Sequence, residues 1–411
     1  MKIAIIGTGI SGLGAAYLLN PLHNITVYEK NDYIGGHSRT ITLPDGRAVD
    51  TGFIVYNERN YPLLLGLFRH LNVPVIKSEM SFGASIGNGW LEYGSKGMFG
   101  QVANILRPRY WRMLADILRF NRQAPAFIDR PGNITLGTCL DQLKMGDWSR
   151  RYYIQAMGAA IWSCSIETIL DFPAQTFLRF FQNHGLLTVN DHPQWYTVKG
   201  GSREYVSRLT ASFRDKIVTG CGVKTVSRSG GKVQIHDERG AVREFDHVVF
   251  ACHADQTLQL LNDADEKERD IFESFGFQEN RLIVHRDTSF MPKHRKCWAS
   301  WVYLSGETED KKPVVSLSYW MNNLQSLPGD PVIITLNPGR RPAENTIVDE
   351  HVFDHPVFTQ AAINAQERIP ELQGYKNTWH CGAWQRYGFH EDGLLSAVNM
   401  AKGLGANVPW K

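Results

Sequence analysis

Three ionisable residues stand side by side near the end of the 411-residue chain: His390, Glu391 and Asp392, within the stretch YGFHEDGLL. An imidazole beside two carboxylates could form an acid–base cluster, bind a metal ion or simply begin a last helix. No further ligand-type residue stands at a suitable spacing from them, so we predict no metal site. Beyond Gly393 apolar residues recur at helical spacing and Gly405 follows, which predicts a helix with Asp392 as its N-cap.

The N-terminal segment carries the most specific pattern in the chain. GTGISG follows the β-branched run KIAIIG, so Gly7, Gly9 and Gly12 form a G-x-G-x-x-G loop between a predicted strand and a predicted helix. A second predicted strand, NITVYEK, ends at Glu29. Such glycines allow a tight turn and a close approach of pyrophosphate, and the acid accepts hydrogen bonds from a ribose. The sequence therefore predicts a dinucleotide site.

Two features after Glu29 indicate which dinucleotide binds. Gly35 and Gly36 form a second glycine pair, and VDTGFIVYNERNYP follows from residue 49. Both features resemble the FAD-dependent amine oxidase and phytoene desaturase superfamily, which implies non-covalently bound FAD. Where an arginine commonly follows the glycine pair in that superfamily, this chain has His37, with Arg39 two residues on. Either side chain is a candidate to assist the pyrophosphate.

The glycine loop and the resemblance together imply a set of cofactor-binding residues. They are Gly7, Gly9, Ile10, Ser11, Gly12, Glu29, Lys30, Gly35, Gly36, His37, Ser38, Arg39, Thr51, Gly52, Phe53 and Val223, with Glu391, Asp392, Gly393 and Leu394 at the start of the last helix.

The resemblance also implies the fold class. We expect an α/β protein with a Rossmann-like FAD-binding domain of the glutathione-reductase and amine-oxidase type, interleaved with an α+β substrate domain on an antiparallel sheet. The predicted FAD-binding segments are 1–80, 195–275 and 371–411. The predicted substrate-domain segments are 81–194, mostly helical, and 276–370, which contains four antiparallel strands between residues 281 and 337.

Five segments narrow the resemblance further: 160–187, 195–206, 295–304, 318–327 and 387–394. Together they resemble a bacterial subfamily of FAD/NAD(P)-binding oxidoreductases that is similar to the N-terminal domain of plant cyclopropane fatty acid synthases. This resemblance implies desaturation or another oxidation of a fatty acyl chain, methylated or unsaturated, and a functional link to a fatty-acid methyltransferase. Three alternatives stay open: an amine or amino-acid oxidase, a redox-neutral isomerase of fatty-acid double bonds, and a non-catalytic binding protein of the same fold.

Two residues are candidates for catalysis. Amine oxidases of the superfamily usually hold a water near the flavin with a lysine, and alignment of RLIVHRDTSFM places Arg281 at that position. A guanidinium stays protonated, so it would bind an anion rather than act as a base. The resemblance also implies that Phe389 or His390 occupies the place of an aromatic residue that faces the flavin ring, which leaves His390 as a proton carrier. Cys381 is expected to be a buried residue rather than a flavin attachment site.

Composition excludes several classes of protein. Apolar residues make up 43% and charged residues 21% of the chain, and a net charge of +3 gives no reason to expect nucleic-acid binding. The six cysteines are widely spaced, which favours free thiols in a reducing cytoplasm. The apolar start of the chain superficially resembles a signal peptide, but its four glycines serve better as the nucleotide loop.

An arginine-rich amphipathic stretch, residues 103–122, has two interpretations. It is either a surface helix that covers a core or a helix at a membrane surface, with arginines near lipid phosphates and Trp111 at the interface. The second interpretation predicts a cytoplasmic protein with peripheral contact at the inner face of the membrane.

Overall fold

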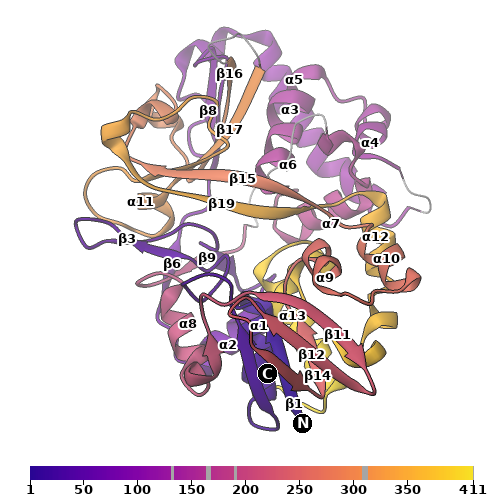
Figure 1. Ribbon diagram of the computed structural model, residues 1–411. Helices are drawn as coiled ribbons and strands as arrows, with labels where there is room; N and C mark the ends of the chain where they lie inside the picture. The colour runs from indigo at the N-terminus through magenta and orange to yellow at the C-terminus, as the bar shows by residue number, and fades with distance from the viewer. Residues whose placement is uncertain (131–133, 163–167, 189–191, 308–312, 411) are drawn as a thin grey trace.

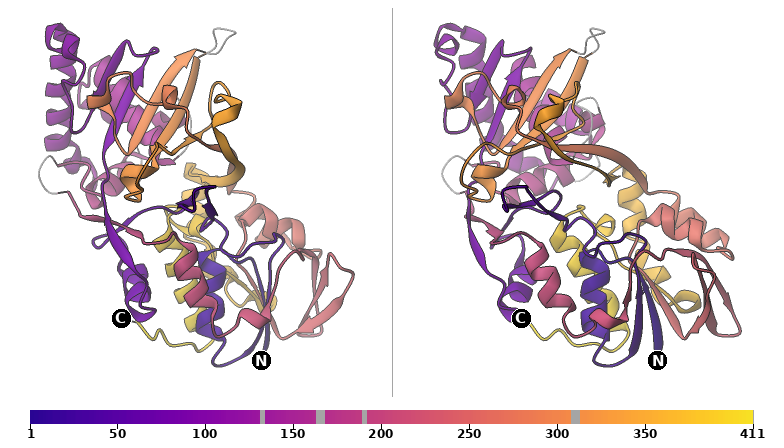
Figure 2. Two further views of the ribbon diagram at one scale, coloured as in Figure 1. Left: turned by 90° about the vertical axis from the view of Figure 1, so that its left-hand side faces the viewer. Right: turned by 60° about the vertical axis from the view of Figure 1, so that its left-hand side comes forward.

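The computed structural model describes residues 1–130, 134–162, 168–188, 192–307 and 313–410; Cys164, within the segment 160–187 used above, lies outside these ranges. The chain forms two domains, one above the other in Figure 1. The lower domain holds both termini and a parallel sheet, and the upper domain holds a larger sheet flanked by helices (Figure 1). Indigo, pink and yellow segments lie together in the lower domain in Figure 2, so distant parts of the chain build it jointly.

A five-stranded sheet in the order β10-β2-β1-β14-β20 forms the centre of the lower domain. All neighbouring strands run parallel. Side chains of β1 alternate between two cores, with Ile5 packed on one face and Ala4 on the other. The predicted Rossmann-like fold is confirmed. The strands are β1 (Lys2–Ile6), β2 (Asn24–Tyr28), β10 (Ile217–Val218), β14 (His247–Phe250) and β20 (Thr378–His380).

The two faces of this sheet are covered differently. Helices pack on the Ile5 face, and a three-stranded antiparallel sheet packs on the Ala4 face. The helices are α1 (Ile10–Leu19), α2 (Pro62–His70), α8 (Arg203–Thr210) and α13 (His390–Gly403). The small sheet contains β11 (Val223–Ser229), β12 (Lys232–Asp237) and β13 (Val242–Phe245), and the chain returns from it directly to β14 as predicted.

The sheet of the upper domain is larger than predicted. It has seven strands in the order β19-β15-β18-β17-β16-β7-β8 rather than four, and β16 pairs with β7 in parallel. The difference arises because a hairpin from residues 82–94 and a strand from residues 347–357 join the two edges. The strands are β7 (Phe82–Ile86), β8 (Leu91–Gly94), β15 (Gly276–His285), β16 (Trp301–Glu307), β17 (Pro313–Trp320), β18 (Ile333–Leu336) and β19 (Ile347–Val357).

Helices between residues 102 and 183 form the outer part of the upper domain (Figure 1). They include η1 (Val102–Leu106), α3 (Pro108–Gln123), η2 (Ala124–Phe127), α4 (Leu136–Gln142), α5 (Asp147–Ser149), the π-helix η3 (Arg150–Ile154), α6 (Gln155–Trp162), η4 (Thr168–Asp171) and α7 (Ala174–Asn183). No helix in the described part of the chain is long and apolar enough to cross a membrane.

Short elements connect these layers. The strands are β3 (Thr40–Thr42) with β4 (Ala48–Asp50), and β5 (Tyr56–Asn57) and β6 (Val75–Ser78) with β9 (Trp195–Val198). The helices are η5 (Arg214–Lys216), α9 (Ala254–Leu260), α10 (Glu266–Phe272), η6 (Thr288–Phe290), η7 (Arg295–Cys297), α11 (Met321–Leu324), η8 (Glu344–Thr346), α12 (Gln360–Gln366), η9 (Ile369–Leu372), η10 (Tyr375–Asn377) and η11 (Ala383–Gln385).

The last helix exists as predicted but begins three residues earlier. α13 starts at His390 with Phe389 in the N-cap position, so the prediction that Asp392 is the N-cap is wrong. The carboxylate of Asp392 instead accepts a hydrogen bond of 3.0 Å from the backbone N–H of Phe389, as the third helical residue of a capping box does. Gly405 has a φ of +84° just past the helix, which confirms the predicted end.

Candidate functional site

A cavity of about 1100 Å³ lies between the two domains. Its lower wall contains Gly9, Ile10, Ser11, His37 and residues 51–55 of the parallel-sheet domain. Its upper wall comes from the large sheet and from α3, α6 and α7. Both helix starts that the sequence singled out, those of α1 and α13, contribute residues to the lining.

The first glycine loop is shaped by backbone contacts. Gly7 has a φ of +105°, and a Cβ on Gly12 would lie 2.0 Å from the carbonyl oxygen of Gly7. A Cβ on Gly9, in contrast, would meet no atom within 4 Å, and no side chain caps α1. The first N–H groups of α1 therefore face open space, as phosphate binding at a helix N-terminus requires.

The second glycine loop lies against the first. Gly36 has a φ of +56°, and a Cβ there would lie 2.9 Å from the Cα of Gly9. The next wall segment is held to this loop by the backbone, because Phe53 donates to the carbonyl of His37 at 2.8 Å. A Cβ on Gly52 would lie 2.1 Å from that same carbonyl oxygen. At Gly12, Gly36 and Gly52 the backbone behind the lower wall therefore packs too closely for a side chain, whereas Gly9 faces open space.

Glu29 lies at the end of β2, as the ribose role requires, but its carboxylate is fully engaged in protein contacts. One oxygen accepts the N–H and the hydroxyl of Thr8 at 3.1 and 2.5 Å, and the other accepts the backbone N–H and the side-chain amide of Asn31, both at 2.8 Å. A carboxylate offers about four acceptor positions. A ribose diol at Glu29 would therefore replace the Thr8 hydroxyl or the Asn31 amide.

The two candidates for the pyrophosphate contact have different environments. His37 lines the cavity, and its ring stacks on Phe353 with centroids 4.4 Å apart. Burial holds the pKa of His37 well below its usual value, so the ring is neutral. Arg39 forms a bidentate ion pair of 2.7 and 3.0 Å with Asp349 of β19 and is absent from the lining. The structure therefore puts a neutral imidazole, and no arginine, at the cavity wall of this loop.

His390 lies on the cavity wall but is tightly held. Its ring stacks on Phe53 at 3.8 Å, and its Nε2 is 2.9 Å from the hydroxyls of both Ser38 and Tyr205. Burial lowers the pKa of His390 to about 3. A ring that is neutral and hydrogen-bonded in this way positions Phe53 and the start of α13, and the geometry does not favour a proton carrier.

Glu391 points away from the cavity. Its two carboxylate oxygens accept the backbone N–H groups of Leu63 and Leu64, at 2.8 and 2.9 Å, in the first turn of α2. This helix begins with Pro62 and has no cap of its own. Glu391 thus supplies the N-terminal cap of α2 from a different helix, and the row of ionisable residues is structural rather than an acid–base cluster.

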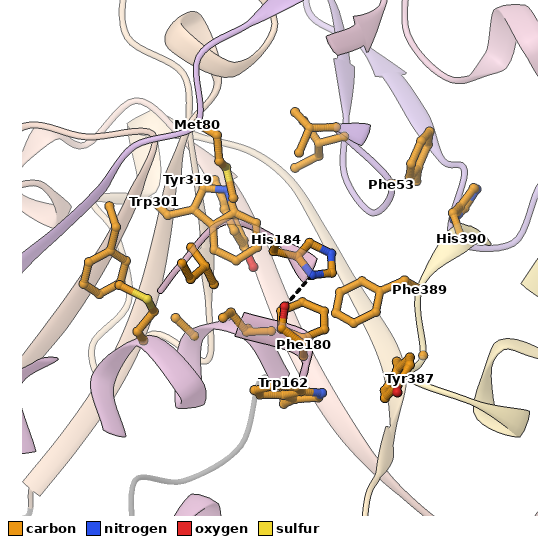
Figure 3. A pocket seen from close by; sticks show the side chains of 18 of the residues that line it. Phe53, Met80, Trp162, Phe180, His184, Trp301, Tyr319, Tyr387, Phe389 and His390 are labelled. Carbon is orange, nitrogen blue, oxygen red and sulfur yellow. Dashed lines mark hydrogen bonds between the residues drawn. The ribbon is translucent and has the colours of Figure 1, made fainter. Parts of the chain in front are cut away.

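An aromatic group on the opposite side of the cavity was not predicted. Phe180 of α7 stacks on His184 at 3.7 Å and on Phe389 at 4.8 Å (Figure 3). Phe389, rather than His390, is therefore the aromatic residue that faces the upper domain. His184 donates its Nδ1–H to the carbonyl oxygen of Phe180 at 2.9 Å, which leaves Nε2 as an acceptor, and burial lowers its pKa to about 4.

Arg281 is the clearest correction. It lies on β15, but its side chain is 56% exposed, pairs with Glu350 at 2.5 Å and does not line the cavity. Side chains of a strand alternate between faces. Asn280 pairs in register with the cavity-lining Phe353, whereas Arg281 pairs with the exposed Val352. The alignment selected the right strand and the wrong face.

The predicted cofactor residues fall into two groups. Those that line the cavity are Gly9, Ile10, Ser11, His37, Thr51, Gly52 and Phe53. Those that lie behind or beside the wall are Gly7, Gly12, Glu29, Lys30, Gly35, Gly36, Ser38, Arg39, Val223, Glu391, Asp392, Gly393 and Leu394. The assignment of each as a cofactor contact stays a prediction. Cys381 is fully buried and does not line the cavity.

Sequence reasoning missed several lining residues, among them Phe180, His253 and His355. His253 could have been found, because it follows β14 closely and ligands bind outside the carboxyl ends of parallel strands. His355 leaves no local signal, because its position depends on the pairing of β19 with β15.

The lower half of the cavity fits FAD. The first turns of α1 and α13 begin at its wall, and Gly393 approaches the side chains of Ile10 and Ser11 so closely that a Cβ would lie 2.8 Å from each. Two helix N-termini thus meet at one place, where their free N–H groups favour phosphate and an anionic reduced flavin.

Comparisons with known proteins agree with this fit. The family model of flavin-containing amine oxidoreductases matches residues 10–341. A 15-cis-phytoene desaturase from Synechococcus elongatus is 38% identical over 74 residues, which cover 18% of this chain and 15% of the desaturase. The chain covers between 15% and 54% of the length of the curated relatives it matches.

Solved structures share the fold over nearly the whole chain. A CLA-producing fatty acid isomerase from P. acnes has a TM-score of 0.70 at 16% identity, with 98% of both chains covered. A cyclohexylamine oxidase from Brevibacterium oxydans also has a TM-score of 0.70 at 16% identity, covering 98% of this chain and 99% of the other. The chain therefore belongs to the family of flavin-containing amine oxidoreductases.

Proposed function

We propose that this enzyme oxidises a fatty acyl chain, as a dehydrogenase or desaturase does. The observation that supports this is the composition of the upper half of the cavity, which extends from the FAD side to α3 and is predominantly aliphatic and aromatic. Its lining includes Met80, Phe82, Ile117, Met157, Ile161, Trp162, Phe180, Trp301 and Tyr319, several of which Figure 3 shows. A long apolar wall of this kind fits a long apolar substrate.

The neutral ring of His184 is a candidate acceptor for the proton that such a reaction releases. Dehydrogenation removes a hydride from one carbon and a proton from its neighbour as the double bond forms, and FAD, when bound, supplies the hydride acceptor. With Nδ1–H donated to Phe180, Nε2 of His184 can accept the proton at the cavity wall. The stacks on Phe180 and toward Trp195 fix the plane of the ring.

Oxidation of an amine is the second candidate. The rings of Phe180 and Phe389 would attract a cationic amine, and the carboxylate of Asp354 also stands on the cavity wall. Isomerisation of a double bond would use the same acyl substrate without net electron transfer. It differs from oxidation in that the flavin is still oxidised when the product has formed.

Anaerobic mixing of the yellow holoprotein with candidate substrates tests these alternatives. We expect phospholipids with unsaturated or methylated chains to bleach the flavin absorbance at about one equivalent and polyamines to leave it unchanged. Bleaching by polyamines alone would overturn the proposal in favour of amine oxidation. A shifted double bond in the recovered lipid, with the flavin still oxidised, would establish isomerisation instead.

Two histidine variants test the proton acceptor. We expect His184→Phe to slow the bleaching by roughly 100-fold or more while the flavin spectrum stays unchanged. His192→Phe is the matched control, because His192 lines the same cavity but is exposed. Equal rates for the His184→Phe variant and the wild type would remove His184 from the reaction.

The link to a fatty-acid methyltransferase follows from the same proposal and has its own test. If methylated acyl chains are the natural substrate, the second-order bleaching rate is higher for them than for unmethylated chains of equal length. Equal rates would leave the oxidation of acyl chains in place and remove the link.

A further inference from the structure

Large apolar side chains are exposed together at one edge of the upper domain. Eleven such side chains are highly exposed in the described chain, and five of them belong to η1 and α3. They are Val102 at 69%, Ile105 at 48%, Leu106 at 85%, Trp111 at 50% and Leu118 at 59% exposure. Single exposed apolar residues are normal on a protein surface, whereas a cluster of them usually marks an interaction site. This cluster is therefore a candidate binding surface.

These five residues form one surface, called here the η1–α3 surface. The indole N–H of Trp111 donates to the carbonyl oxygen of Ile105 at 2.9 Å, which holds η1 against the first turn of α3. Leu118 follows Trp111 by seven residues, about two helical turns, and therefore lies on the same face of α3. Figure 1 places α3 on the outside of the upper domain, far from both termini.

The surface is also cationic. Arg109, Arg112 and Arg122 are exposed on α3, and none of them forms an ion pair with any residue that the structure describes. The only acid of this helix, Asp116, is 3% exposed and is turned inward, where it binds Arg119 and the backbone N–H of Gly146. Arg122, four residues after Leu118, therefore stands on the same face of α3 as the apolar tips, and Arg109 and Arg112 lie next to them in the chain, near the start of the helix.

We infer that the η1–α3 surface docks on a lipid bilayer that carries anionic headgroups. Apolar side chains of this size reach the acyl boundary, an indole prefers the interface, and arginines bind lipid phosphates. A second copy of the chain is a poorer partner, since a two-fold interface would bring the same unpaired arginines face to face. This inference concerns where the enzyme binds and does not depend on which bond it oxidises.

The same helix also forms part of the cavity wall. Leu114, Ile117, Leu118 and Asn121 line the cavity, and Leu118 is exposed as well, so the wall reaches the molecular surface there. If the proposed function holds, a docked enzyme would receive its acyl chain from the bilayer beside α3. The docking itself does not depend on the proposed function.

Flotation of the FAD-loaded enzyme with vesicles tests the docking. Vesicles of phosphatidylcholine alone are compared with vesicles that also contain phosphatidylglycerol, at low and at raised salt. We expect binding to the anionic vesicles, weakened by salt. Arg112→Ser/Arg122→Ser should lower this binding by about 25-fold, roughly fivefold for each charge, and Leu106→Glu should lower it by about tenfold or more.

Matched controls separate the surface from general effects. Leu22→Glu replaces an equally apolar side chain, 53% exposed in the other domain, and Arg214→Ser/Lys224→Ser removes two exposed charges there. Both controls should bind vesicles as the wild type does. Far-UV circular dichroism and flavin absorbance confirm that each variant is folded.

Three outcomes would overturn the inference: no binding to anionic vesicles, equal loss of binding in the controls, or unchanged binding of Leu106→Glu. Light scattering without vesicles identifies a dimer that Leu106→Glu disrupts, which would assign the surface to a second copy instead. An enzyme that floats with vesicles but is never bleached by acyl lipids would retain the docking and lose the proposed function.

Discussion

The two halves of the cavity are built from different materials. The lower half is shaped mainly by backbone, namely two glycine loops in contact, a segment bonded to the carbonyl of His37 and the starts of α1 and α13, with the side chains of His37, Phe53 and His390 upon it. The upper half is side chain: rings and methyl-bearing residues from α3, α6, α7 and the large sheet. At Gly12, Gly36 and Gly52 an added Cβ would lie within 3 Å of backbone atoms, whereas a side-chain wall can change its shape one residue at a time. The first half suits a fixed cofactor and the second a variable substrate.

Breaking the backbone half should have the largest effect. Gly12→Ala places a Cβ 2.0 Å from the carbonyl oxygen of Gly7, which α1 can relieve only by moving off β1. We expect a loss of about 3 kcal/mol or more in unfolding free energy and a protein purified without yellow colour. Gly276→Ala is the control, because its Cβ meets no atom within 4 Å and its φ is ordinary. Normal flavin content in Gly12→Ala would contradict the tight packing of the loop.

A variant of Glu391 tests whether the carboxylates at the start of α13 stabilise the fold or take part in catalysis. Glu391→Gln replaces one of the two acceptors that cap α2 with a donor facing an N–H group. We expect a loss of about 1–3 kcal/mol in urea unfolding, with the anaerobic reduction rate of the bound flavin unchanged within about threefold. The control is Glu279→Gln on an exposed position of β15. A fall in rate without a fall in stability would restore a catalytic role.

His390 allows the same distinction through pH. Because burial lowers its pKa to about 3, its folded state excludes the proton that the unfolded chain binds near pH 6.5. The stability contributed by the neutral ring is therefore present above about pH 6.5 and is lost as pH falls toward 3. His390→Gln should be about 1–2 kcal/mol less stable at neutral pH, and this deficit should shrink on acidification. A deficit that grows below pH 6 would contradict the assignment of a neutral ring.

Arg281→Ala should have the smallest effect. Its ion pair with Glu350 is exposed, so unfolding free energy should change by less than about 0.5 kcal/mol and flavin reduction should not change. Asn280→Ala, one residue earlier and fully buried on β15, should cost about 1–3 kcal/mol, because it removes hydrogen bonds to His355 and Asn337. The reverse order of effects would place Arg281 in the site after all.

The comparison also explains what could be predicted from the sequence. A backbone wall needs particular residues at fixed local spacing, so Gly7, Gly12 and the strand ending at Glu29 were identifiable, and with them the parallel sheet. The side-chain wall depends on which face of a strand or helix is turned inward. On β15 a shift of one residue decides which side chain faces inward. The alignment selected Arg281, whereas Asn280 is the residue that faces inward.

Long-range contacts were beyond local patterns for the same reason. The capping of α2 by Glu391 joins residues more than 300 positions apart, and the ring stack of Phe180 with Phe389 joins two domains. α13 starts earlier than predicted because Asp392 accepts the backbone N–H of Phe389 as the third residue of the helix. In the sequence, an Asp before an apolar run looks the same whether it is that third residue or the N-cap.

The ion pair between Arg39 and Asp349 has a thermodynamic consequence. It ties the loop that carries His37 to β19, the strand whose Phe353 and His355 line the upper wall. A ligand that immobilises the loop therefore also restricts the motion of β19, so the cofactor side and the substrate side of the cavity are coupled. Coupling of this kind is reciprocal. If FAD bound along the loop strengthens the binding of a substrate held against β19, that substrate strengthens the binding of FAD by the same free energy.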